Sequence, residues 1–569
     1  MSAARSWRTP PHQESMRRVS TKRGRCLPLS RNVRGLRDPR VARRSHQSLI
    51  HRRRIRWSAK MVDVVVVGLG PVGSLLALLL AEAGQKVLVL ERSTEPVVLP
   101  RAVALDGEAM RTFQQLGLAE KVSAILQPAR NPDEVCFANS KREKLFGSRL
   151  PDCGPNGWRD LAFFDQPELE ALLRAEVAKS ERIEVRLGCE VTGLENADEA
   201  VMLECRSTRN NASLTIEARY VLGCDGASSF IRSAAGIGWK SLGYDQDWLV
   251  VDIVIQPEAE LPMSTMQVCD PNRLATYVCV KDPNRRWEFQ MLPGETRAEM
   301  QQPQRIQELL DPWLPPEHYT IRRAAVYQFH AATAETWRRG RILLVGDAAH
   351  QTPPFLGQGL NTGIRDAANL AWKLTRVLRG ECTDQLLDSY EEERDPQARE
   401  LVSGAVAVGQ LMEVLAAREA GRPDPPLPAS GPPEPGRLVP PLRSGLLVAD
   451  QLGQADTSVG TLIRQPDVRE AAGGIGPLDD LLGSGFAILG QTGQDLRLSP
   501  ESQALWKALG GRLVALEDFE YDPPDQDPLF EHHPAALIRP DRYVYGVVDA
   551  AWTLERLIGH LATEMGYVE

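Results

Sequence analysis

A glycine-rich turn near residue 70, set between a β-branched run and an apolar run, restricts the fold more than any other part of the chain. The run Met61–Val67 is mostly valine, as expected for a buried parallel strand. The turn that follows carries Gly68, Gly70 and Gly73, and the apolar run after it ends at Gly84. This order predicts the strand, turn and helix of a dinucleotide-binding unit, because the backbone can approach a pyrophosphate closely only where side chains are absent.

The next strand-like run, Lys86–Leu90, ends in Glu91. An acid at this point of the unit accepts a hydrogen bond from a ribose hydroxyl, so Glu91 and the neighbouring Arg92 are expected to contact the cofactor. In the preceding turn the first glycine should make the tight bend, the second should admit the pyrophosphate, and the third should let the helix pack on the strand. A glycine-rich turn without a ligand is the alternative. The unit by itself allows either NAD or FAD.

A second cofactor motif lies far downstream, at Gly346–Asn361. The strand-like run Arg341–Val345 precedes it and the helix-like run Asp366–Leu374 follows it. An acid in such a turn can bind sugar hydroxyls, glycines let the backbone approach a ring, and the helix N-terminus brings partial positive charge. A flavin needs a second anchor of this kind, so the motif favours FAD. The predicted contacts in this motif are Gly346, Asp347, Gly357, Gly359, Leu360 and Asn361.

A third motif lies between the other two, at Tyr220–Arg232, where a strand-like run ends in Asp225-Gly and a turn leads into a short helix. Asp225 is therefore a further candidate for cofactor binding. The order GxGxxG, DGxxSxxR and GDAAHxxPPxxGxGxN resembles that of the class A flavoprotein aromatic hydroxylases, the family of the para-hydroxybenzoate and phenol hydroxylases. The resemblance extends from about Val62 to about Arg394 and continues more loosely to the end of the chain.

Three further segments, Pro100–Asp106, Trp248–Asp252 and Arg286–Glu295, look most like the 3-(3-hydroxyphenyl)propionate hydroxylases within that family. The resemblance implies hydroxylation of a phenolic aromatic substrate with NADH or NADPH and O2, through a flavin C4a-hydroperoxide on FAD. A different aromatic or polyketide-tailoring flavin oxygenase, or a flavin-binding redox module without hydroxylation, are the alternatives.

The resemblance also assigns roles to single residues. It implies that Arg101 and Gln166 contact the cofactor, and that Pro354 shapes the wall beside the oxygen-reactive carbon of the flavin. His350 lies within the downstream motif, where the family places a residue beside the cofactor that is not a base. The predicted phenol-activating residue is His330, and the other candidates for the substrate pocket are Tyr277, Glu288, Gln290 and Phe329.

A substrate carboxylate would require a cation, and Arg273, Arg285 and Arg286 are present in the same region. Residues 288 and 290 share one face of their strand because side chains alternate along a strand, although the alternation does not say which face is inward.

The expected fold class is α/β, with a Rossmann-like FAD-binding domain of the glutathione-reductase type, an inserted and mostly antiparallel β domain for the substrate, and a C-terminal region that resembles the thioredoxin-like domain of phenol hydroxylases. That region has no cysteine and cannot carry out disulfide chemistry, so packing and homodimer formation are its expected roles. The expected boundaries are 1–60 for a basic extension, 61–243 with 335–418 for the FAD domain, 244–334 for the substrate domain, 419–444 for a proline-rich linker, and 445–569 for the C-terminal domain.

Charge and cysteine usage bear on location and partners. Residues 1–60 hold 16 Arg and 2 Lys against two acids, a net charge of +16, whereas the whole chain carries −8. A disordered or non-native extension is expected there, with a targeting segment or a nucleic-acid arm as alternatives. The nine cysteines form no CxxC pair, as in a reduced cytoplasmic protein. No nucleic acid, no membrane and no metal are expected, since neither a long apolar run nor a metal-binding histidine pattern occurs.

Overall fold

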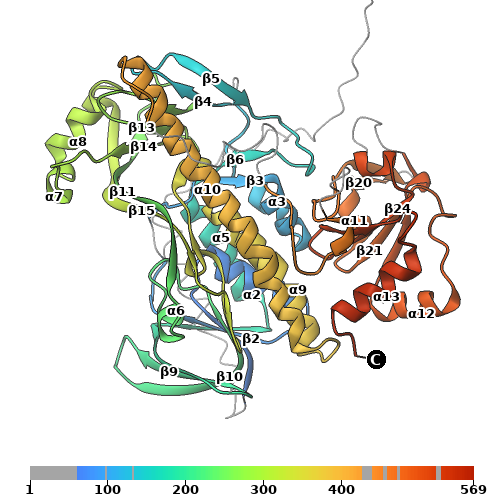
Figure 1. The fold of residues 1–569 in the computed structure, drawn as a ribbon. Helices are drawn as coiled ribbons and strands as arrows, with labels where there is room; N and C mark the ends of the chain where they lie inside the picture. The colour runs from blue at the N-terminus through green and yellow to red at the C-terminus, as the bar shows by residue number, and fades with distance from the viewer. Residues whose placement is uncertain are drawn as a thin grey trace, which may run out of the picture. The chain divides into compact units, whose positions relative to one another are not determined.

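The computed structural model describes residues 61–568, except 97–98, 131–133, 426–438, 453–457, 471–473 and 521–526. The predicted extension at residues 1–60 and half of the predicted proline-rich linker lie outside the described residues. Figure 1 shows the order of the helices and strands along the chain.

The first sheet is built around the valine-rich strand β1 (Val62–Val67), which runs parallel to a neighbour on each side. Most of β1 is buried, which explains its nearly continuous apolar sequence. Helix α2 (Pro71–Glu82) follows β1 and contacts both α5 (Gln166–Lys179) and α9 (Gly359–Leu378). The main path of the sheet is β16 (Arg338–Arg339), β17 (Ile342–Leu344), β10 (Ser213–Gly223), β1, β2 (Val87–Glu91) and β7 (Ile183–Leu187), and β10 also pairs with the antiparallel strands β9 (Val201–Ser207) and β8 (Cys189–Asn196).

The second sheet is mostly antiparallel, as the strand pattern of residues 244–334 predicted, but it is wider than that segment. Its longest strand begins at Trp239, and a hairpin from residues 134–149 joins one edge through a parallel pairing. The sequence interpretation had placed that hairpin in the FAD domain, because no local signal reports such a distant pairing. The order is β18 (His350–Gln351), β15 (Tyr319–Ala334), β11 (Trp239–Ile255), β14 (Asn284–Gln290), β13 (Ala275–Val278), β12 (Thr265–Val268), β4 (Glu134–Ala138) and β5 (Lys144–Arg149).

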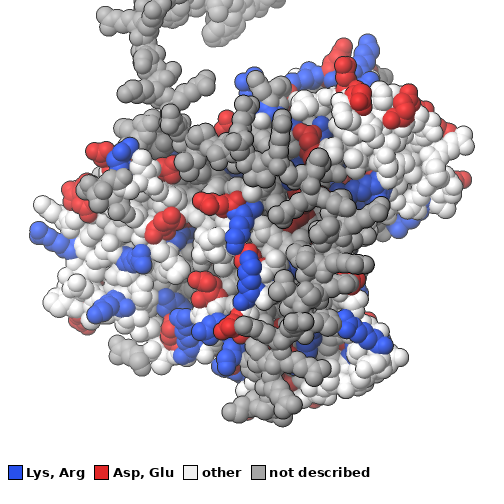
Figure 2. Space-filling view, turned by 180° about the vertical axis from the view of Figure 1, so that it is seen from behind, with Lys and Arg blue, Asp and Glu red and all other residues white. Residues whose placement is uncertain are grey.

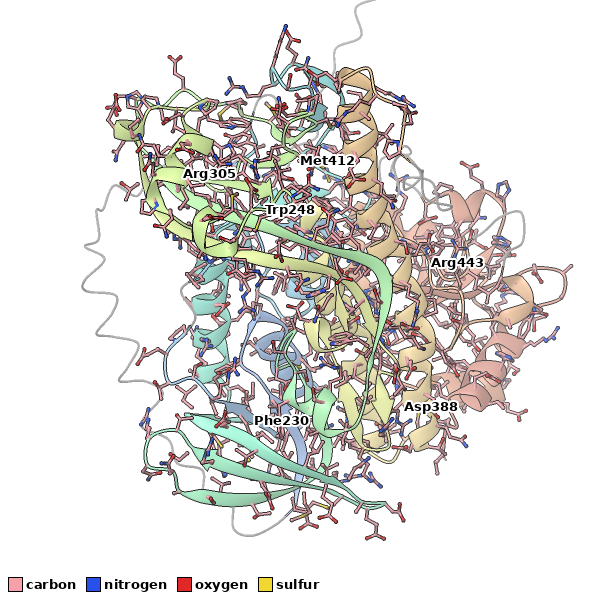
Figure 3. The ribbon with its side chains drawn as sticks, turned by 60° about the vertical axis from the view of Figure 1, so that its left-hand side comes forward. Phe230, Trp248, Arg305, Asp388, Met412 and Arg443 are labelled. Carbon is pink, nitrogen blue, oxygen red and sulfur yellow. The ribbon has the colours of Figure 1, made fainter. Side chains whose placement is uncertain are left out.

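The long helix α10 (Asp388–Glu419) contacts α9 and also strands β11 and β15 of the second sheet. Figure 3 shows Trp248 and Met412 where α10 meets this sheet, and both belong to one buried apolar cluster. Among the described residues one helical stretch, Asp384–Glu419, is long and apolar enough to cross a membrane. Within its most apolar window 67% is buried inside the protein, as in the core helix of a globular protein.

The C-terminal region forms a smaller sheet in which β21 and β22 are parallel and the remaining pairs are antiparallel. Its contacts with the rest of the chain include buried ion pairs: Arg111 on α3 (Gly107–Gln115) binds Asp479 through two hydrogen bonds of 2.8 and 2.7 Å. The elements here are β22 (Arg512–Ala515), β21 (Ala487–Gly490), β24 (Ala535–Ile538), β25 (Val544–Val547), α11 (Leu478–Leu482), α12 (Pro500–Ala508) and α13 (Leu554–Glu564), with a small sheet of β20 (Ile475–Pro477), β19 (Asp467–Glu470) and β23 (Phe519–Glu520).

The remaining short elements connect these layers. They are the strand pair β3 (Ala104–Asp106) and β6 (Leu161–Phe163), and the helices α4 (Ala119–Ser123), α6 (Phe230–Ala234), α7 (Arg297–Met300) and α8 (Pro303–Leu310). On the face shown in Figure 2, acidic and basic side chains are interspersed and do not gather into a large patch of one sign.

Candidate functional site

A cavity of about 1110 Å³ is lined by residues of both large sheets. One end lies at the carboxyl ends of β1, β2 and β10 and at the first turns of α2 and α9, and the other end lies against the second sheet. The carboxyl edge of a parallel sheet is the usual place for a nucleotide-type ligand. The predicted contacts that line this cavity are Gly68, Gly70, Glu91, Arg92, Arg101, Gln166, Asp225, Asp347, Pro354, Gly357, Gly359 and Leu360.

The first glycine motif has the backbone geometry that a close ligand requires. Gly68 has φ of 105°, a conformation that favours glycine, and forms the bend after β1. A Cβ at Gly73 would lie 2.2 Å from the carbonyl oxygen of Gly68, so only glycine allows the helix to pack this closely on the turn. A Cβ at Gly70 would meet no atom within 4 Å, because Gly70 borders the open cavity. The space beside Gly70 and the N-terminus of α2 suits a phosphate group.

Glu91 lies at the end of β2, on the wall of the cavity. Its carboxylate accepts hydrogen bonds of 2.8 Å from the backbone N–H groups of Leu69 and Ser93. These bonds fix the carboxylate beside the glycine turn, and its remaining acceptor capacity can serve a ribose hydroxyl.

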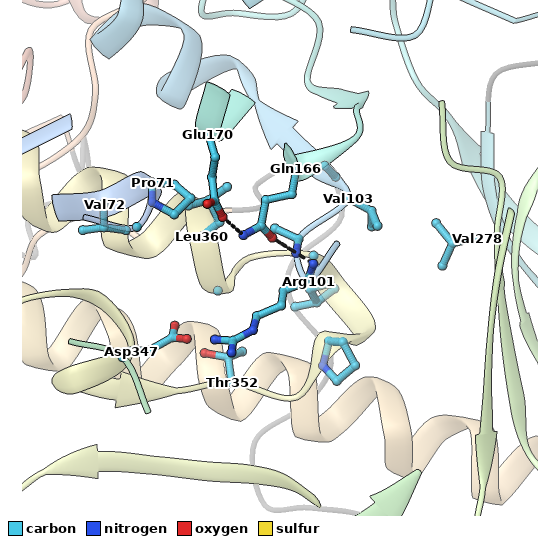
Figure 4. A pocket seen from close by; sticks show the side chains of 18 of the residues that line it. Pro71, Val72, Arg101, Val103, Gln166, Glu170, Val278, Asp347, Thr352 and Leu360 are labelled. Carbon is cyan, nitrogen blue, oxygen red and sulfur yellow. Dashed lines mark hydrogen bonds between the residues drawn. The ribbon is translucent and has the colours of Figure 1, made fainter. Parts of the chain in front are cut away.

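The loop that carries Arg101 is held by Gln166. The side-chain oxygen of Gln166 accepts hydrogen bonds from the backbone N–H groups of Arg101 (2.9 Å) and Ala102 (2.6 Å), and its amide nitrogen donates to Glu170 at 2.7 Å. Figure 4 shows these bonds and the guanidinium of Arg101 directed towards Asp347 and Thr352. Gln166 therefore positions the loop as well as bordering the cavity.

Asp347 borders the cavity and has no hydrogen-bond partner among the described residues. Desolvation raises the pKa of this carboxyl, against the opposing effect of His350 and Arg101. The side chain of Asp347 is exposed to the open cavity, so its unpartnered carboxylate can accept a hydrogen bond from a ligand hydroxyl.

Three predicted residues lie just behind the cavity wall. Gly346 has φ of 65° and donates its N–H to Asp366 at 3.0 Å. The side chain of Asn361 accepts from the N–H of Asp106 at 3.1 Å and donates to the carbonyl of Gly357 at 3.0 Å. Gly73, Gly346 and Asn361 therefore support the cavity wall from behind, and none of the three lines the cavity itself.

His350 is completely enclosed and serves the framework of the downstream motif. Its Nε2 lies 2.6 Å from Asp366, which also accepts a hydrogen bond of 3.0 Å from Arg394. Although burial would raise the pKa of Asp366, His350 and Arg394 hold it below its ordinary value. This arrangement secures the turn before α9 and agrees with the expectation that His350 is not a base.

Side-chain alternation on the second sheet separates a cavity face from a core face. In β14 the even-numbered residues Arg286 and Glu288 border the cavity, whereas Trp287 and Phe289 pack in the core on the other side. Neighbouring strands follow the same rule. The cavity face of β4, β12, β13 and β14 consists of Val135, Phe137, Thr265, Gln267, Thr276, Val278, Arg286 and Glu288.

The predicted phenol-activating residue His330 does not reach the cavity, and that prediction is corrected here. The strand pairing places His330 opposite Asp245, and the two form an ion pair while the histidine side chain remains 39% exposed. Tyr277 lies in the core and donates to the carbonyl of Pro262 at 2.8 Å. The side chain of Gln290 binds Gln246, and Phe329 stacks on Trp248, so neither of these two lines the cavity.

The three arginines proposed for a substrate carboxylate are all engaged elsewhere. Arg273 pairs with Glu295, Arg285 pairs with Asp282 at 2.7 Å, and Arg286 pairs with Asp252 at 2.7 Å. Arg149 at the end of β5 borders the cavity, opposite Glu134 in the strand pairing, and its positive charge helps to lower the pKa of Glu134. Its guanidinium forms no hydrogen bond or ion pair within the described part of the chain.

Sequence reasoning missed Thr265, Gln267 and Thr276, which are the uncharged polar residues of the cavity face. Thr276 donates to the side-chain oxygen of Gln267 at 2.7 Å, and the amide of Gln267 donates to the carbonyl of Phe355 at 3.3 Å. The strand containing Thr276 was recognised, but Tyr277 on its opposite face was chosen. Among the described residues no cluster of three or more His, Cys, Asp or Glu could hold a metal ion.

Comparison with known proteins identifies the class. The family described as "FAD binding domain" matches residues 61–405, and the "HcaD C-terminal domain" matches residues 460–564. The chain is 33% identical over 540 residues to the probable NADH-specific resorcinol 4-hydroxylase of Rhodococcus jostii (strain RHA1), covering 90% of this chain and 96% of that protein. It is 36% identical over 476 residues to the 3-(3-hydroxy-phenyl)propionate/3-hydroxycinnamic acid hydroxylase of Mycobacterium avium (strain 104), covering 80% of each chain.

A solved structure of aklavinone-11 hydroxylase with FAD and aklavinone superposes with a TM-score of 0.76 at 25% identity, covering 89% of this chain and 99% of that one. Fold and site thus define a mixed α/β flavoprotein monooxygenase. The chain belongs to the FAD binding domain family, and it is an FAD-dependent aromatic hydroxylase with NAD(P)H as co-substrate. The family expected from the sequence is confirmed.

Proposed function

We propose that this enzyme hydroxylates a small phenolic acid, of the kind represented by 3-(3-hydroxyphenyl)propionate, with NADH as its reductant. The observation that carries the proposal is the shared cavity, in which the cofactor contacts and the aromatic and polar face of the second sheet border the same space. The names of the two relatives support both a phenolic substrate and NADH.

The residues at the cofactor end fit FAD. Backbone N–H groups at the first turns of α2 and α9 favour negative charge, and Glu91 and Asp347 offer acceptors for sugar hydroxyls. Bound FAD supplies the redox chemistry, taking a hydride from the nicotinamide and activating dioxygen for transfer of one oxygen atom to the ring. Backbone N–H groups in the first turn of α9, which begins at Gly359, would stabilise negative charge on bound FAD at this end of the cavity.

The other end suits an aromatic ring. Phe137 and Phe146 stack at 4.8 Å between ring centroids and border the cavity together with Phe355 and Val278. Apolar walls exclude water from the reacting ring, while Thr276 and its neighbours provide hydrogen-bonding groups for a phenol. Pro354 belongs to the cofactor motif and borders the cavity next to Phe355 of this wall, which supports its proposed place beside the reacting carbon.

Arg149 is the proposed anchor for the substrate carboxylate. It stands on the exposed strand β5 at the border of the cavity, and although its charge acts on Glu134, its guanidinium forms no hydrogen bond or ion pair among the described residues. Arginine binds carboxylates through two parallel hydrogen bonds, so it can fix the orientation of a phenolic acid as well as attract it.

The finer architecture is part of this proposal. We infer a Rossmann-like FAD domain from the parallel sheet and a thioredoxin-like C-terminal domain from the order β21–α12–β22 followed by β24, β25 and α13. That domain has no cysteine, and we propose that it packs against the FAD domain and serves homodimer formation in a cytoplasmic enzyme.

A polycyclic phenol is the second candidate substrate. The structure of aklavinone-11 hydroxylase with aklavinone, at a TM-score of 0.76, supports it. The test is to measure NADH oxidation with phenolic acids, neutral phenols and polycyclic phenols, and to identify each product. The proposal expects strong stimulation by a phenolic acid and formation of its ring-hydroxylated product, whereas stimulation by polycyclic phenols alone would select the second candidate.

A further inference from the structure

Glu288 occupies an unusual position on the cavity face of the second sheet. It is only 3% exposed, it borders the cavity, and its carboxylate accepts no hydrogen bond within the described part of the chain. Its closest cation is Arg286, whose Nη1 lies 3.9 Å away. A buried carboxylate in a folded protein normally has hydrogen-bond partners, so its free oxygen atoms point to a ligand with a proton to share.

The surrounding charges do not neutralise Glu288. Arg286 is committed to Asp252 and to two backbone carbonyls, and Arg323 binds the other oxygen of Asp252 at 2.7 Å. Desolvation raises the pKa of Glu288 to about 7; Arg286 and Arg323 oppose this shift, and Asp252 adds to it. Tyr244 on β11 also interacts with the charge of Glu288, and burial raises the pKa of Tyr244 well above its ordinary value.

Seven acids border the cavity, and most of those other than Glu288 are paired or more exposed. Glu190 pairs with Arg206, and Asp160 has no hydrogen bond among the described residues but is only partly buried. Glu91 accepts two backbone hydrogen bonds, Asp225 accepts from Ser229 and from the N–H of Ile231, and Glu170 accepts from Gln166. Asp347 belongs to the cofactor motif. Glu288 instead lies across the strand pairing from Thr276, on the aromatic part of the cavity.

We propose that Glu288 is the general base that accepts the phenolic proton of the substrate. This inference rests on the proposed function, because a phenol must be present in the cavity. The O–H bond of the phenol breaks, its proton forms an O–H bond on the Glu288 carboxylate, and the electron pair stays on the phenolate oxygen. The phenolate is more electron-rich than the phenol, so its ring accepts the oxygen atom more readily.

The test compares the wild type with Glu288→Gln and Glu288→Asp across pH, measuring hydroxylated product and FAD content. His330→Gln is the matched control, because it changes a titratable residue of the same sheet outside the cavity. For the wild type we expect the rate to rise with pH through about 7. For Glu288→Gln we expect product formation at pH 7 to fall by roughly 10²–10⁴-fold, with bound FAD retained.

Two further readouts distinguish a base from a structural residue. The rate of Glu288→Gln should rise towards the ionisation of the free phenol, near pH of about 10, and a ring-fluorinated substrate with a more acidic phenol should recover much of the lost rate. Glu288→Asp should keep the rise near neutral pH at a lower rate, which preserves the test if the Gln variant does not fold.

A Glu288→Gln enzyme with the rate and pH profile of the wild type would overturn the inference. So would equal losses for the ordinary and the fluorinated substrate, since those indicate a structural defect. A wild type that no phenol stimulates would instead contradict the proposed function, so the two failures are distinguishable.

Discussion

The Nη1 of Arg286 donates a hydrogen bond of 2.6 Å to the carbonyl oxygen of Arg101. The same peptide segment is held from the opposite direction by Gln166, which accepts from the N–H of Arg101 at 2.9 Å. Arg286 on β14 of the second sheet and Gln166 on α5 therefore hold the same loop, which carries Arg101. The two ends of the cavity are mechanically connected through this loop, and changes in the substrate sheet should affect the binding of FAD.

Replacing Arg286 tests this connection. Arg286→Met should release the Arg101 loop and leave Asp252 with Arg323 as its only cation among the described residues. We expect a loss of roughly 3–5 kcal/mol in stability, as for a broken buried ion pair, together with weaker FAD binding. Thermal unfolding and flavin fluorescence titration measure the two effects. The control Arg273→Gln breaks a pair with Glu295 that lies outside the cavity, so it should leave FAD affinity unchanged. Unchanged FAD affinity in Arg286→Met would contradict the connection.

Asp347 should be a principal determinant of FAD affinity. Asp347→Ala removes an acceptor that has no other partner among the described residues, so FAD should bind about 10–100-fold more weakly, corresponding to the loss of one hydrogen bond to a charged group. Asp347→Asn retains an acceptor oxygen and should lose less. The measurement is the dissociation constant of FAD for the wild type and both variants. Full flavin retention in the Ala variant would show that Asp347 does not contact the cofactor.

Arg149 should set the preference for acids over neutral phenols. Arg149→Gln removes the cation but keeps a polar side chain at the border of the cavity. We expect KM for a phenolic acid to rise about 10-fold or more, while KM for the corresponding neutral phenol stays within a factor of about two. Steady-state kinetics on the matched pair of substrates is the measurement. An equal change for both substrates would remove Arg149 from the carboxylate site.

Glu288 should also influence how stability depends on pH. Because the folded protein raises the pKa of Glu288 from 4.5 to about 7, the stability linked to its proton is complete below about 4.5 and is lost as the pH rises through 7. The glutamine of Glu288→Gln does not titrate. The free energy of unfolding of this variant should therefore rise relative to that of the wild type, by on the order of 3 kcal/mol between pH of about 4.5 and about 7. Thermal unfolding of the FAD-saturated, substrate-free enzymes at several pH values measures the difference.

Glu295 provides a control of opposite sign for that experiment. Hydrogen bonding to Arg273 lowers the pKa of Glu295 to about 2, so its stabilising contribution is present above pH 4.5 and is lost as the pH falls towards 2. Glu295→Gln should therefore be less stable than the wild type at neutral pH, and the gap should narrow in acid. A constant difference for Glu288→Gln at every pH would exclude the raised pKa.

The cofactor end was predictable from sequence because each motif is contiguous and depends on local backbone geometry. Gly68 and Gly70 occupy the bend and the open wall that their spacing indicates, and Asp347 lies where its turn places it. The substrate end depends on contacts between distant segments. The alternation along β13 defines two faces, but only the packing of the whole sheet determines that Thr276 is inward and Tyr277 is in the core.

The hairpin β4–β5 illustrates the same limit. Its pairing with β12 joins residues more than a hundred positions apart, and it brings Phe137, Phe146 and Arg149 to the cavity. No periodicity within the hairpin reports that neighbour. His330 was selected as a base because it is a histidine in the right segment, yet the strand register places it on the surface beside Asp245.

The central claim is that one cavity brings FAD and a phenolic acid together for hydroxylation. The most direct test measures NADH consumption by the purified, FAD-loaded enzyme with and without 3-(3-hydroxyphenyl)propionate, together with the mass of the aromatic product. We predict that the phenolic acid strongly accelerates NADH consumption and that the product gains one oxygen atom on its ring. NADH consumption that no phenolic acid accelerates, with every ring recovered unchanged, would contradict the claim.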